Sequence, residues 1–444
     1  MESQKNIFED LKERIWITFC KTFDIENNLS NKSKFNLEYP RESGCGDFTT
    51  NICMVFSKTL SLSPKDIFQK LSQTMQSLDC VKSVDFANPG YLNIAIKTKY
   101  LLNYIENITN SLDLFGSTNT RNNNKTKVEF ASPNPTGPVH IGHVRGAVYG
   151  DVIANLLAKN GYLVTKEYYI NDAGAQIEKL TKSLFIRYQQ ECGIDIQIPS
   201  DCYPGDYLIN VAKDLINTHG TNLSYQKDFD LIKNFVVSKM IDSIKKDLLK
   251  IGIKHDVYTS EFDIIKKGYI QRGLNVLSDK GYIYKGVLPK PKGKASEDWE
   301  EKEQILFKST IFGDDEDRVV KKSDGSDTYF SGDIGYHLNK IERGFQKMIL
   351  SLGADHLGYV KRITSIVKAL QNNTEIDVKL CQLVKFLKNG QPIKMSKRKG
   401  TFETLEDVLD EVDASIIRFI MISKKNDIGI DFDHANVKQT RKHN

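Results

Sequence analysis

The sequence has little glycine and proline and no long hydrophobic run. Glycine and proline contribute 29 and 11 of its 444 residues, which excludes collagen-like and linker-like sequences. No uninterrupted apolar stretch approaches the roughly 18 residues of a membrane-spanning helix, so we expect no membrane segment and no membrane partner. The first residues, MESQKNIFEDLKERIW, include several acids and no continuous apolar core, which is not typical of a signal or transit peptide.

Cysteine is also sparse. The seven cysteines are odd in number and scattered, and no two are spaced as C-x-x-C. This usage argues against a zinc knuckle and against a disulfide framework. We therefore expect reduced thiols in a cytoplasmic protein. The cysteines are Cys20, Cys45, Cys53, Cys80, Cys192, Cys202 and Cys381.

Length and charge restrict the class of protein and its possible partners only broadly. A chain of 444 residues, 40% hydrophobic and 27% charged, is typical of a globular protein with about two or three domains. Lysine and arginine total 62 against 57 acids, which gives a net charge of +5. This mildly basic balance permits a nucleic-acid partner but does not by itself indicate one.

The segment 1–115 has the pattern of a small α+β domain. Apolar residues recur every four positions from Ile7 to Phe19, which predicts an amphipathic helix with one buried face. The stretch 81–97 alternates apolar and polar residues around Pro89–Gly90, which predicts a β-hairpin. The stretch 116–127 lacks apolar residues, and we place a linker there.

From Val128 the pattern changes to strand, loop, helix and strand. The short strand VEF precedes a loop with three prolines, and helical periodicity then continues to Gly161, a C-cap candidate. A second strand, YLVTKEYYI, follows. One βαβ unit of this kind predicts an α/β fold with a parallel sheet. The section 205–285 reads as mostly helical, and the stretches 348–355 and 378–386 read as further strands.

The loop 133–143, PNPTGPVHIGH, is a candidate phosphate site. A loop that enters a helix offers unpaired backbone N–H groups, which together with the helix dipole favour phosphate. Gly142 would let a flat base approach the backbone, and His140 and His143 could donate hydrogen bonds to phosphoryl oxygens. Taken alone, two such histidines are more often helix-cap or core residues than functional ones. The sequence has no P-loop motif and no suitably spaced third zinc ligand.

A second candidate is the basic run from Lys394 to Lys399, which lies between Gly390 and Gly400. Glycines at both ends suit a loop that closes over a polyphosphate. By itself such a run is more often a solvated basic turn.

Together the two stretches resemble the HIGH and KMSK signatures of class I aminoacyl-tRNA synthetases, in the family's order. The surrounding blocks resemble arginyl-tRNA synthetases in particular: VEFASPNPTGPVHIGHVRGAVYGD, EYYINDAGAQI, YFSGDIGYHLNK, GADHLGYVKR and KMSKRKGTFETLEDVL. GDFTTN and ANPGYLNI resemble that family's N-terminal domain.

The resemblance implies a Rossmann-like parallel sheet in the α/β class I catalytic domain, preceded by the small α+β domain. We expect a tRNA-contacting domain at 1–115, a catalytic domain with a helical insertion at 128–410, and the start of a stem-contact helical region at 411–444. The family's helical anticodon-binding domain would follow, and we expect this chain to lack it.

The resemblance also implies residue roles. His140, His143, Lys394 and Lys397 are expected to stabilise charge on the phosphates. Asn134 would meet the α-amino group of arginine, and Tyr329 and Asp333 its guanidinium, although Asp333 alone could be a surface turn acid. The arginine site would comprise Glu129, Ser132, Asn134, Tyr329 and Asp333. The ATP site would comprise Pro133, Thr136, Gly137, His140, Gly142, His143, His356, Lys394, Met395, Ser396 and Lys397.

The implied activity is ATP-dependent activation of arginine to arginyl-adenylate, followed by transfer to the terminal adenosine of tRNA(Arg). ATP is a substrate, Mg²⁺ accompanies the pyrophosphate, no metal is bound to the protein itself, and we expect a cytoplasmic monomer. Two alternatives stay open at this point. A truncated relative could adenylate arginine for an acceptor other than tRNA, or the chain could be an inactive fragment that binds arginine or RNA.

Overall fold

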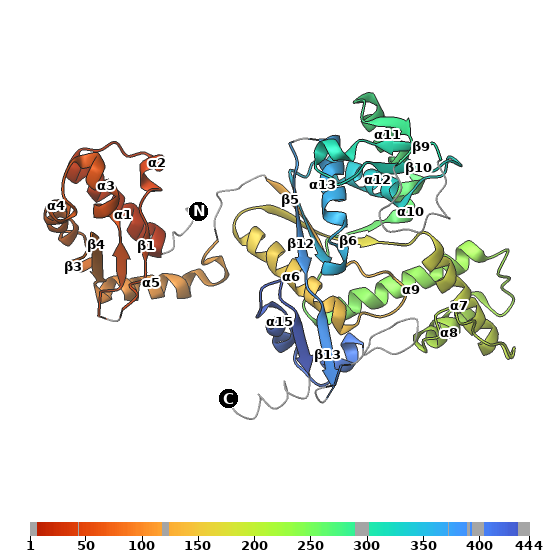
Figure 1. Cartoon of the computed structure of the whole chain (residues 1–444). Coiled ribbons are helices and arrows are strands. Elements are labelled where there is room, and N and C mark those ends of the chain that lie inside the picture. Colours follow the sequence, from red (N-terminus) through yellow and green to blue (C-terminus); the bar gives the residue numbers. More distant parts are fainter. Residues whose placement is uncertain are drawn as a thin grey trace. The chain divides into compact units, whose positions relative to one another are not determined.

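The computed structural model describes residues 7–42, 44–117, 124–288, 302–371, 373–388, 391–392 and 404–433. The chain divides into two compact units, and the division falls between Thr120 and Arg121. None of the helices in the described ranges is both long and apolar enough to span a lipid bilayer. Figure 1 shows the order of the elements along the chain.

The N-terminal unit packs helices against an antiparallel sheet of strand order β1-β2-β4-β3. Its core is apolar and rich in aromatic rings, with Trp16 and Phe19 completely buried. The predicted helix and hairpin are confirmed as α1 and β3–β4. The elements are α1 (Ile7–Phe23), α2 (Leu29–Lys32), β1 (Leu37–Glu38), β2 (Phe48–Thr50), α3 (Ile52–Leu60), α4 (Pro64–Gln76), β3 (Val81–Ala87), β4 (Tyr91–Ile96), α5 (Thr98–Ser111) and the 3-10 helix η1 (Leu112–Leu114).

The second unit is built on a parallel sheet of strand order β12-β11-β5-β6-β7, which confirms the predicted βαβ unit and sheet. β5 begins at Lys125, so the strand includes the last three residues of the predicted linker, because Thr126 and Lys127 pair with strands on both sides. The strands are β5 (Lys125–Glu129), β6 (Leu163–Ile170), β7 (Val257–Ser260), β11 (Lys347–Gly353) and β12 (Glu375–Cys381).

Helices cover this sheet and extend from it. α7, α8 and α9 pack together around their own apolar cluster. α8 and α9 lie in the section 205–285 that was predicted to be mostly helical and that also contains β7 and β8, whereas α7 precedes this section. The helices are α6 (Ile141–Lys159), α7 (Ala175–Glu191), α8 (Tyr207–His219), α9 (Phe229–Lys250), α10 (Glu261–Lys266), α11 (Tyr269–Asp279), α12 (Tyr329–Glu342), the 3-10 helix η4 (Ala354–His356) and α13 (Tyr359–Leu370).

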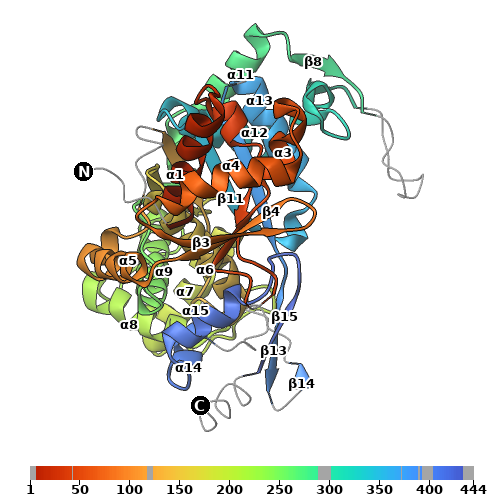
Figure 2. The ribbon, with the colours of Figure 1, turned by 90° about the vertical axis from the view of Figure 1, so that its left-hand side faces the viewer.

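Two small sheets complete the unit. One is antiparallel, with order β10-β9-β8, and the other has order β14-β13-β15. Figure 2 shows the C-terminal elements α14, α15, β13 and β15 gathered together, and their apolar side chains join the core cluster around α6. The elements are β8 (Ile283–Gly286), β9 (Gln304–Phe307), the 3-10 helix η3 (Ser309–Phe312), β10 (Arg318–Lys321), β13 (Val384–Lys388), β14 (Gln391–Pro392), α14 (Leu405–Leu409), α15 (Ala414–Ile422) and β15 (Ile430–Asp433).

All seven cysteines are free thiols, as their spacing predicts. The histidine, cysteine and acidic residues of the described ranges form no cluster of three that could hold a metal ion.

Candidate active site

The order of the parallel strands places the topological switch point of the sheet between β5 and β11. From β5 the chain moves outward through β6 and β7, and it returns on the other side of β5 as β11 and then β12. At such a switch point the loops leave the carboxyl ends of neighbouring strands in opposite directions, and ligands bind between them. The loop 131–140 follows β5, and η4 with His356 follows β11.

Backbone and side-chain hydrogen bonds fix the loop after β5. Ala131 has a positive φ of 49°, which turns the chain sharply away from the strand. The Ser132 hydroxyl then accepts a hydrogen bond from the backbone N–H of Tyr169 at 2.9 Å, and the Pro133 carbonyl accepts one from the hydroxyl of Tyr168 at 2.5 Å. The loop is therefore tied directly to β6.

The next residues of the loop are tied to two helices. The Asn134 amide donates to the side-chain oxygen of Gln176 in α7 at 2.9 Å, and the buried Thr136 accepts on its carbonyl from the Tyr207 hydroxyl at 2.6 Å. A Cβ atom on Gly137 would lie 3.2 Å from the Tyr207 ring. Glycine is thus required where the loop passes this ring.

The two histidines stand at the start of α6. Their rings stack with centroids 3.6 Å apart and an interplanar angle of 27°, and the His143 N–H donates to the His140 carbonyl at 2.9 Å. A Cβ atom on Gly142 would lie 3.1 Å from the His140 ring, so a side chain there would displace that ring. The histidines, Gly142 and the positive end of α6 therefore lie together, an arrangement suited to phosphate.

The predicted residues Lys394, Met395, Ser396 and Lys397 lie outside the described residues. The first described residue after them, Thr404, forms an isolated β-bridge with His140. Leu405 N–H also donates to the Val139 carbonyl at 2.8 Å. A capping box between Thr404 and Asp407 fixes the start of α14. The structure thus joins the chain that follows the basic run to the histidine loop.

His356 lies in η4 at the carboxyl end of β11, and its side chain is half exposed. Its ring meets that of Tyr359 edge-on, with centroids 5.7 Å apart. His356 follows β11, which pairs with β5, and the loop after β5 carries His140. This position agrees with the ATP site expected from the sequence.

Glu129, at the end of β5, belongs to a buried cluster of charges. Its Oε2 atom lies 2.8 Å from Lys340 Nζ and 3.1 Å from Lys127 Nζ, and it accepts a hydrogen bond from the Tyr336 hydroxyl at 2.8 Å. Glu167 of β6 lies 2.7 Å from Lys127 and 2.6 Å from Arg343. The carboxylates of Glu129 and Glu167 are thus paired with three cationic side chains. These are Lys127, Lys340 and Arg343.

The cluster shifts the protonation of its members. Burial by itself would raise the pKa of Glu129, but the ammonium groups of Lys340 and Lys127 outweigh burial and hold that pKa well below its usual range. Burial and the neighbouring Lys340 lower the pKa of Lys127 to about 7. Glu129 is therefore a carboxylate at neutral pH.

The two residues predicted at the guanidinium, Tyr329 and Asp333, lie one turn apart on α12 and so share a face of the helix. Tyr329 is 84% exposed, whereas Asp333 is partly buried. A second acid, Glu261 of α10, lies next to them, because its Oε1 atom is 4.0 Å from where a Cβ atom on Gly332 would stand.

Asp333 and Glu261 lack a cation. Within the described part of the chain, neither carboxylate forms an ion pair or a hydrogen bond. Burial raises the pKa of Asp333 to about 7 although Lys340 opposes the shift. Burial, together with Asp172, raises the pKa of Glu261 to about 7. Two adjacent acids of this kind favour a cationic ligand.

Glu261, Lys127, Tyr336 and Lys340 were not found from the sequence. For three of them a signal exists. Lys127 and Glu129 are two residues apart in a strand, hence on one face. Asp333, Tyr336 and Lys340 recur at helical spacing in α12. For Glu261 the sequence gives no comparable pattern.

Two family models match the chain. The model "tRNA synthetases class I (R), catalytic domain" matches residues 105–440, and the model "Arginyl tRNA synthetase N terminal domain" matches residues 4–96.

Individual proteins agree with the models. An arginine–tRNA ligase from Wolbachia sp. subsp. Brugia malayi (strain TRS) is 44% identical over 99% of the chain and 77% of the relative. One from Rickettsia prowazekii is 45% identical over 99% of the chain and 76% of the relative. The arginyl-tRNA synthetase structure from Thermus thermophilus shares the fold, with a TM-score of 0.64 at 17% identity over 97% of this chain and 78% of that one. The chain belongs to the arginyl-tRNA synthetase family.

Proposed function

We propose that this chain is an arginine–tRNA ligase, as its relatives are named. In the first step the carboxylate of arginine attacks the α-phosphorus of ATP, and pyrophosphate leaves. In the second step a ribose hydroxyl of the terminal adenosine of tRNA(Arg) attacks the mixed anhydride, and AMP leaves. No covalent enzyme intermediate is needed, so positioning and electrostatic stabilisation supply the rate.

We assign ATP to the switch point between β5 and β11. The stacked rings of His140 and His143 stand at the positive end of α6, where negative charge on the transferring phosphate would be stabilised. Gly142 accommodates the His140 ring, which would lie 3.1 Å from a Cβ atom at that position. Lys394 and Lys397 would add positive charge, and Mg²⁺ would enter with the ATP phosphates, its usual ligands at such sites.

The unpaired acids Asp333 and Glu261 are the observation that carries the assignment of arginine. A guanidinium has five donors in a planar fork and stays charged in proteins, so it can bind both carboxylates and supply the cation that they lack. A lysine ammonium is a point charge and would lose the bidentate geometry. Ser132 and Asn134, held by β6 and α7, would meet the other end of the substrate together with Glu129.

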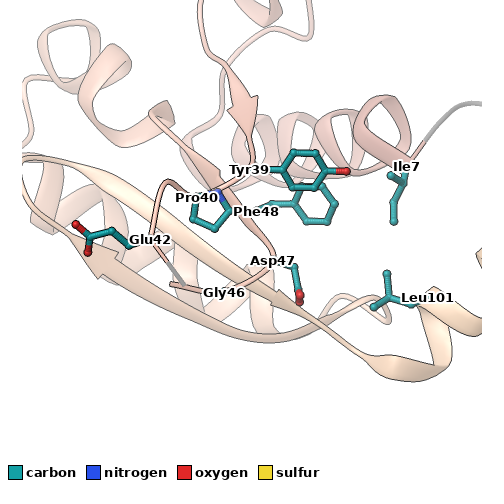
Figure 3. Close-up of a pocket in the computed structure, with 8 residues that line it drawn as sticks. All are labelled: Ile7, Tyr39, Pro40, Glu42, Gly46, Asp47, Phe48 and Leu101. Carbon is teal, nitrogen blue, oxygen red and sulfur yellow. The ribbon is translucent and has the colours of Figure 1, made fainter. Parts of the chain in front are cut away.

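We further propose that the N-terminal unit contacts tRNA. It contains a pocket of about 450 Å³ in which the rings of Tyr39 and Phe48 lie stacked beside Ile7 (Figure 3). Phe48 is buried, but Tyr39 is exposed, and exposed aromatic rings bind unstacked bases. The pocket is lined by Ile7, Tyr39, Pro40, Glu42, Gly46, Asp47, Phe48 and Leu101.

The remaining proposals concern the setting of the reaction. Free thiols and a role in protein synthesis are consistent with a cytoplasmic location. We propose that the chain acts as a monomer without a membrane partner.

Arginine-dependent ATP–pyrophosphate exchange by the purified chain, with and without tRNA(Arg), tests the activity. We expect exchange with arginine and none with lysine, followed by formation of arginyl-tRNA when tRNA is added. Exchange without any transfer to tRNA would favour a different acceptor. An absence of exchange under both conditions would contradict the proposal.

A further inference from the structure

Lys340 is a buried cation of α12, the helix that carries Asp333, and it contacts Glu129 at the other end of the proposed arginine site. Its side chain is completely buried. Its ammonium lies 2.8 Å from Glu129 Oε2 and 3.3 Å from His337 Nε2, and it stands 3.7 Å from the centre of the Tyr336 ring. Lys340 therefore links the end of β5 to the interior of α12.

The link continues from His337 to Asp333. Nδ1 of His337 lies 2.8 Å from the Asp333 carbonyl, and because a carbonyl only accepts, Nδ1 must carry the proton. Nε2 then has a free lone pair for the Lys340 ammonium. The ring is almost completely buried, and burial lowers its pKa well below the usual value, so the neutral tautomer persists. The contacts thus run from Glu129 through Lys340 to His337 and the main-chain carbonyl of Asp333, which lies one turn earlier in the same helix.

The same contacts determine which oxygen of Glu129 is presented to a ligand. Lys340, Lys127 and Tyr336 all contact Oε2. Among the described residues, none donates a hydrogen bond to Oε1. The cluster thus holds one oxygen and leaves the other for a substrate.

Stability gives little reason for a lysine at this position. Moving an ammonium into the interior carries a desolvation penalty of several kcal/mol, and apolar replacements of buried ion pairs are often neutral or stabilising. A lysine that ties the helix of Asp333 to Glu129 is better explained by the positioning of these two site residues.

We propose that Lys340 is a positioning residue that sets the separation of Glu129 and Asp333, and thereby makes the site selective for the length of the arginine side chain. This inference rests on the proposed function. If the two anchors are held at a fixed separation, a substrate with one methylene more or fewer cannot reach both. Loss of the link lets α12 and β5 adjust to other lengths.

The test compares arginine with its homologues that have one methylene less, 2-amino-4-guanidinobutanoate, and one more, homoarginine. Binding of each to the full-length chain is measured by calorimetry. One methylene usually gives about 10–200-fold discrimination. We expect Lys340→Met to lower the preference for arginine about tenfold, while the dissociation constant for ATP stays unchanged.

Arg343→Met is the matched control. It removes a cation of the same cluster, bonded to Glu167 at 2.6 Å, but Arg343 contacts neither Glu129 nor His337. We expect its preference to equal that of the unaltered chain. His337→Leu keeps the pair of Lys340 with Glu129 and removes the contact that orients the Lys340 ammonium within α12, so it tests the same link if Lys340→Met does not fold. We expect it to lower the preference as Lys340→Met does.

An unchanged preference in His337→Leu, or in both variants, would overturn the inference. An equal loss of the preference for arginine in Arg343→Met would also overturn the inference, because removal of any cation of the cluster would then have the same effect. If the unaltered chain bound no arginine, the proposed function would fail first, and this inference with it.

Discussion

The two units of the chain bury different kinds of side chain. The described part of the N-terminal unit buries no charged residue, and its largest buried side chains are aromatic, led by Trp16. The second unit buries Lys127, Glu129, Glu167 and Lys340 within one cluster. Apolar burial stabilises a fold without any ligand, whereas buried charges bring a desolvation penalty.

The difference indicates that the apolar core of the first unit serves stability, whereas the buried charges of the second unit serve substrate binding. The described interior of the N-terminal unit carries no charged group that could bind a substrate. Any partner of this unit is therefore expected to bind at its surface. The second unit retains charges in its interior where arginine is proposed to bind. Substitutions in the first core should therefore affect folding, and substitutions of Glu129 or Lys340 in the charged cluster should affect substrate binding.

The largest expected effect is on folding. Trp16 is completely buried among the rings of Phe19, Phe35 and Phe56, and its Nε1 donates to Asn27 at 2.7 Å. We expect Trp16→Ala to lower the free energy of unfolding of the N-terminal unit by about 3–5 kcal/mol, as measured by urea denaturation with circular dichroism. The KM values for arginine and ATP should stay nearly unchanged.

The control is Leu102→Ala, at a side chain of the same unit that is 59% exposed. It should leave the unfolding transition almost unaltered. A large rise in the KM for arginine in Trp16→Ala would show that the two units do not divide the roles in this way.

The next effect is on arginine recognition. Asp333→Asn keeps the shape of the side chain and removes its charge. Hydrogen bonds to charged groups contribute about 1.5–3 kcal/mol, so we expect the KM for arginine to rise roughly 10–100-fold while the KM for ATP changes little. Steady-state kinetics of aminoacylation measure both values.

Asp324→Asn is the matched control, since this exposed aspartate of the same unit hydrogen-bonds only to Ser326. It should behave as the unaltered chain. Equal rises in the KM for arginine and for ATP in Asp333→Asn would remove Asp333 from guanidinium recognition.

The third prediction concerns pH. The pKa values of Asp333 and Glu261 are each raised to about 7, above those of the unfolded chain near 4. Such groups favour folding at low pH, and this contribution is lost as pH rises from about 4 through 7. Arginine needs the ionised form, so its KM should fall on the order of tenfold between pH 6 and pH 8 if one ionisation controls binding.

Kinetics at several pH values provide the test, with the KM for ATP as the internal reference. In Asp333→Asn the dependence should become weaker. A flat profile for arginine in the unaltered chain would show that these acids do not titrate in the working range.

The sequence predicts what depends on local pattern. The helix at Ile7–Phe23, the hairpin of β3 and β4, and the strand, loop and helix around His140 all follow from spacing and turn residues. The pairing of Lys127 with Glu167 and of Lys340 with Glu129 joins residues 40 to about 210 positions apart. Such contacts arise only when β5, β6 and α12 are assembled.

Glu261 is a further residue whose role the local sequence pattern does not predict. Its neighbours in the sequence, EFD, are ordinary for the first turn of a helix, where acids are favoured by the dipole. Its position beside Gly332 and Asp333 comes from the packing of α10 against α12. A second acid at the proposed guanidinium site therefore had to be found in the structure.

The smallest effect is expected on the surface of the N-terminal unit. Tyr39 is 67% exposed and stacks on Phe48 with centroids 5.7 Å apart. We expect Tyr39→Ala to raise the KM for tRNA(Arg) about fivefold, near the low end of a base–aromatic contact, because other contacts to tRNA remain. Tyr91→Ala, at an exposed ring of the same unit outside the pocket, should have no effect. A rise in the KM for arginine in Tyr39→Ala would contradict the division in which the N-terminal unit binds tRNA and the second unit binds arginine.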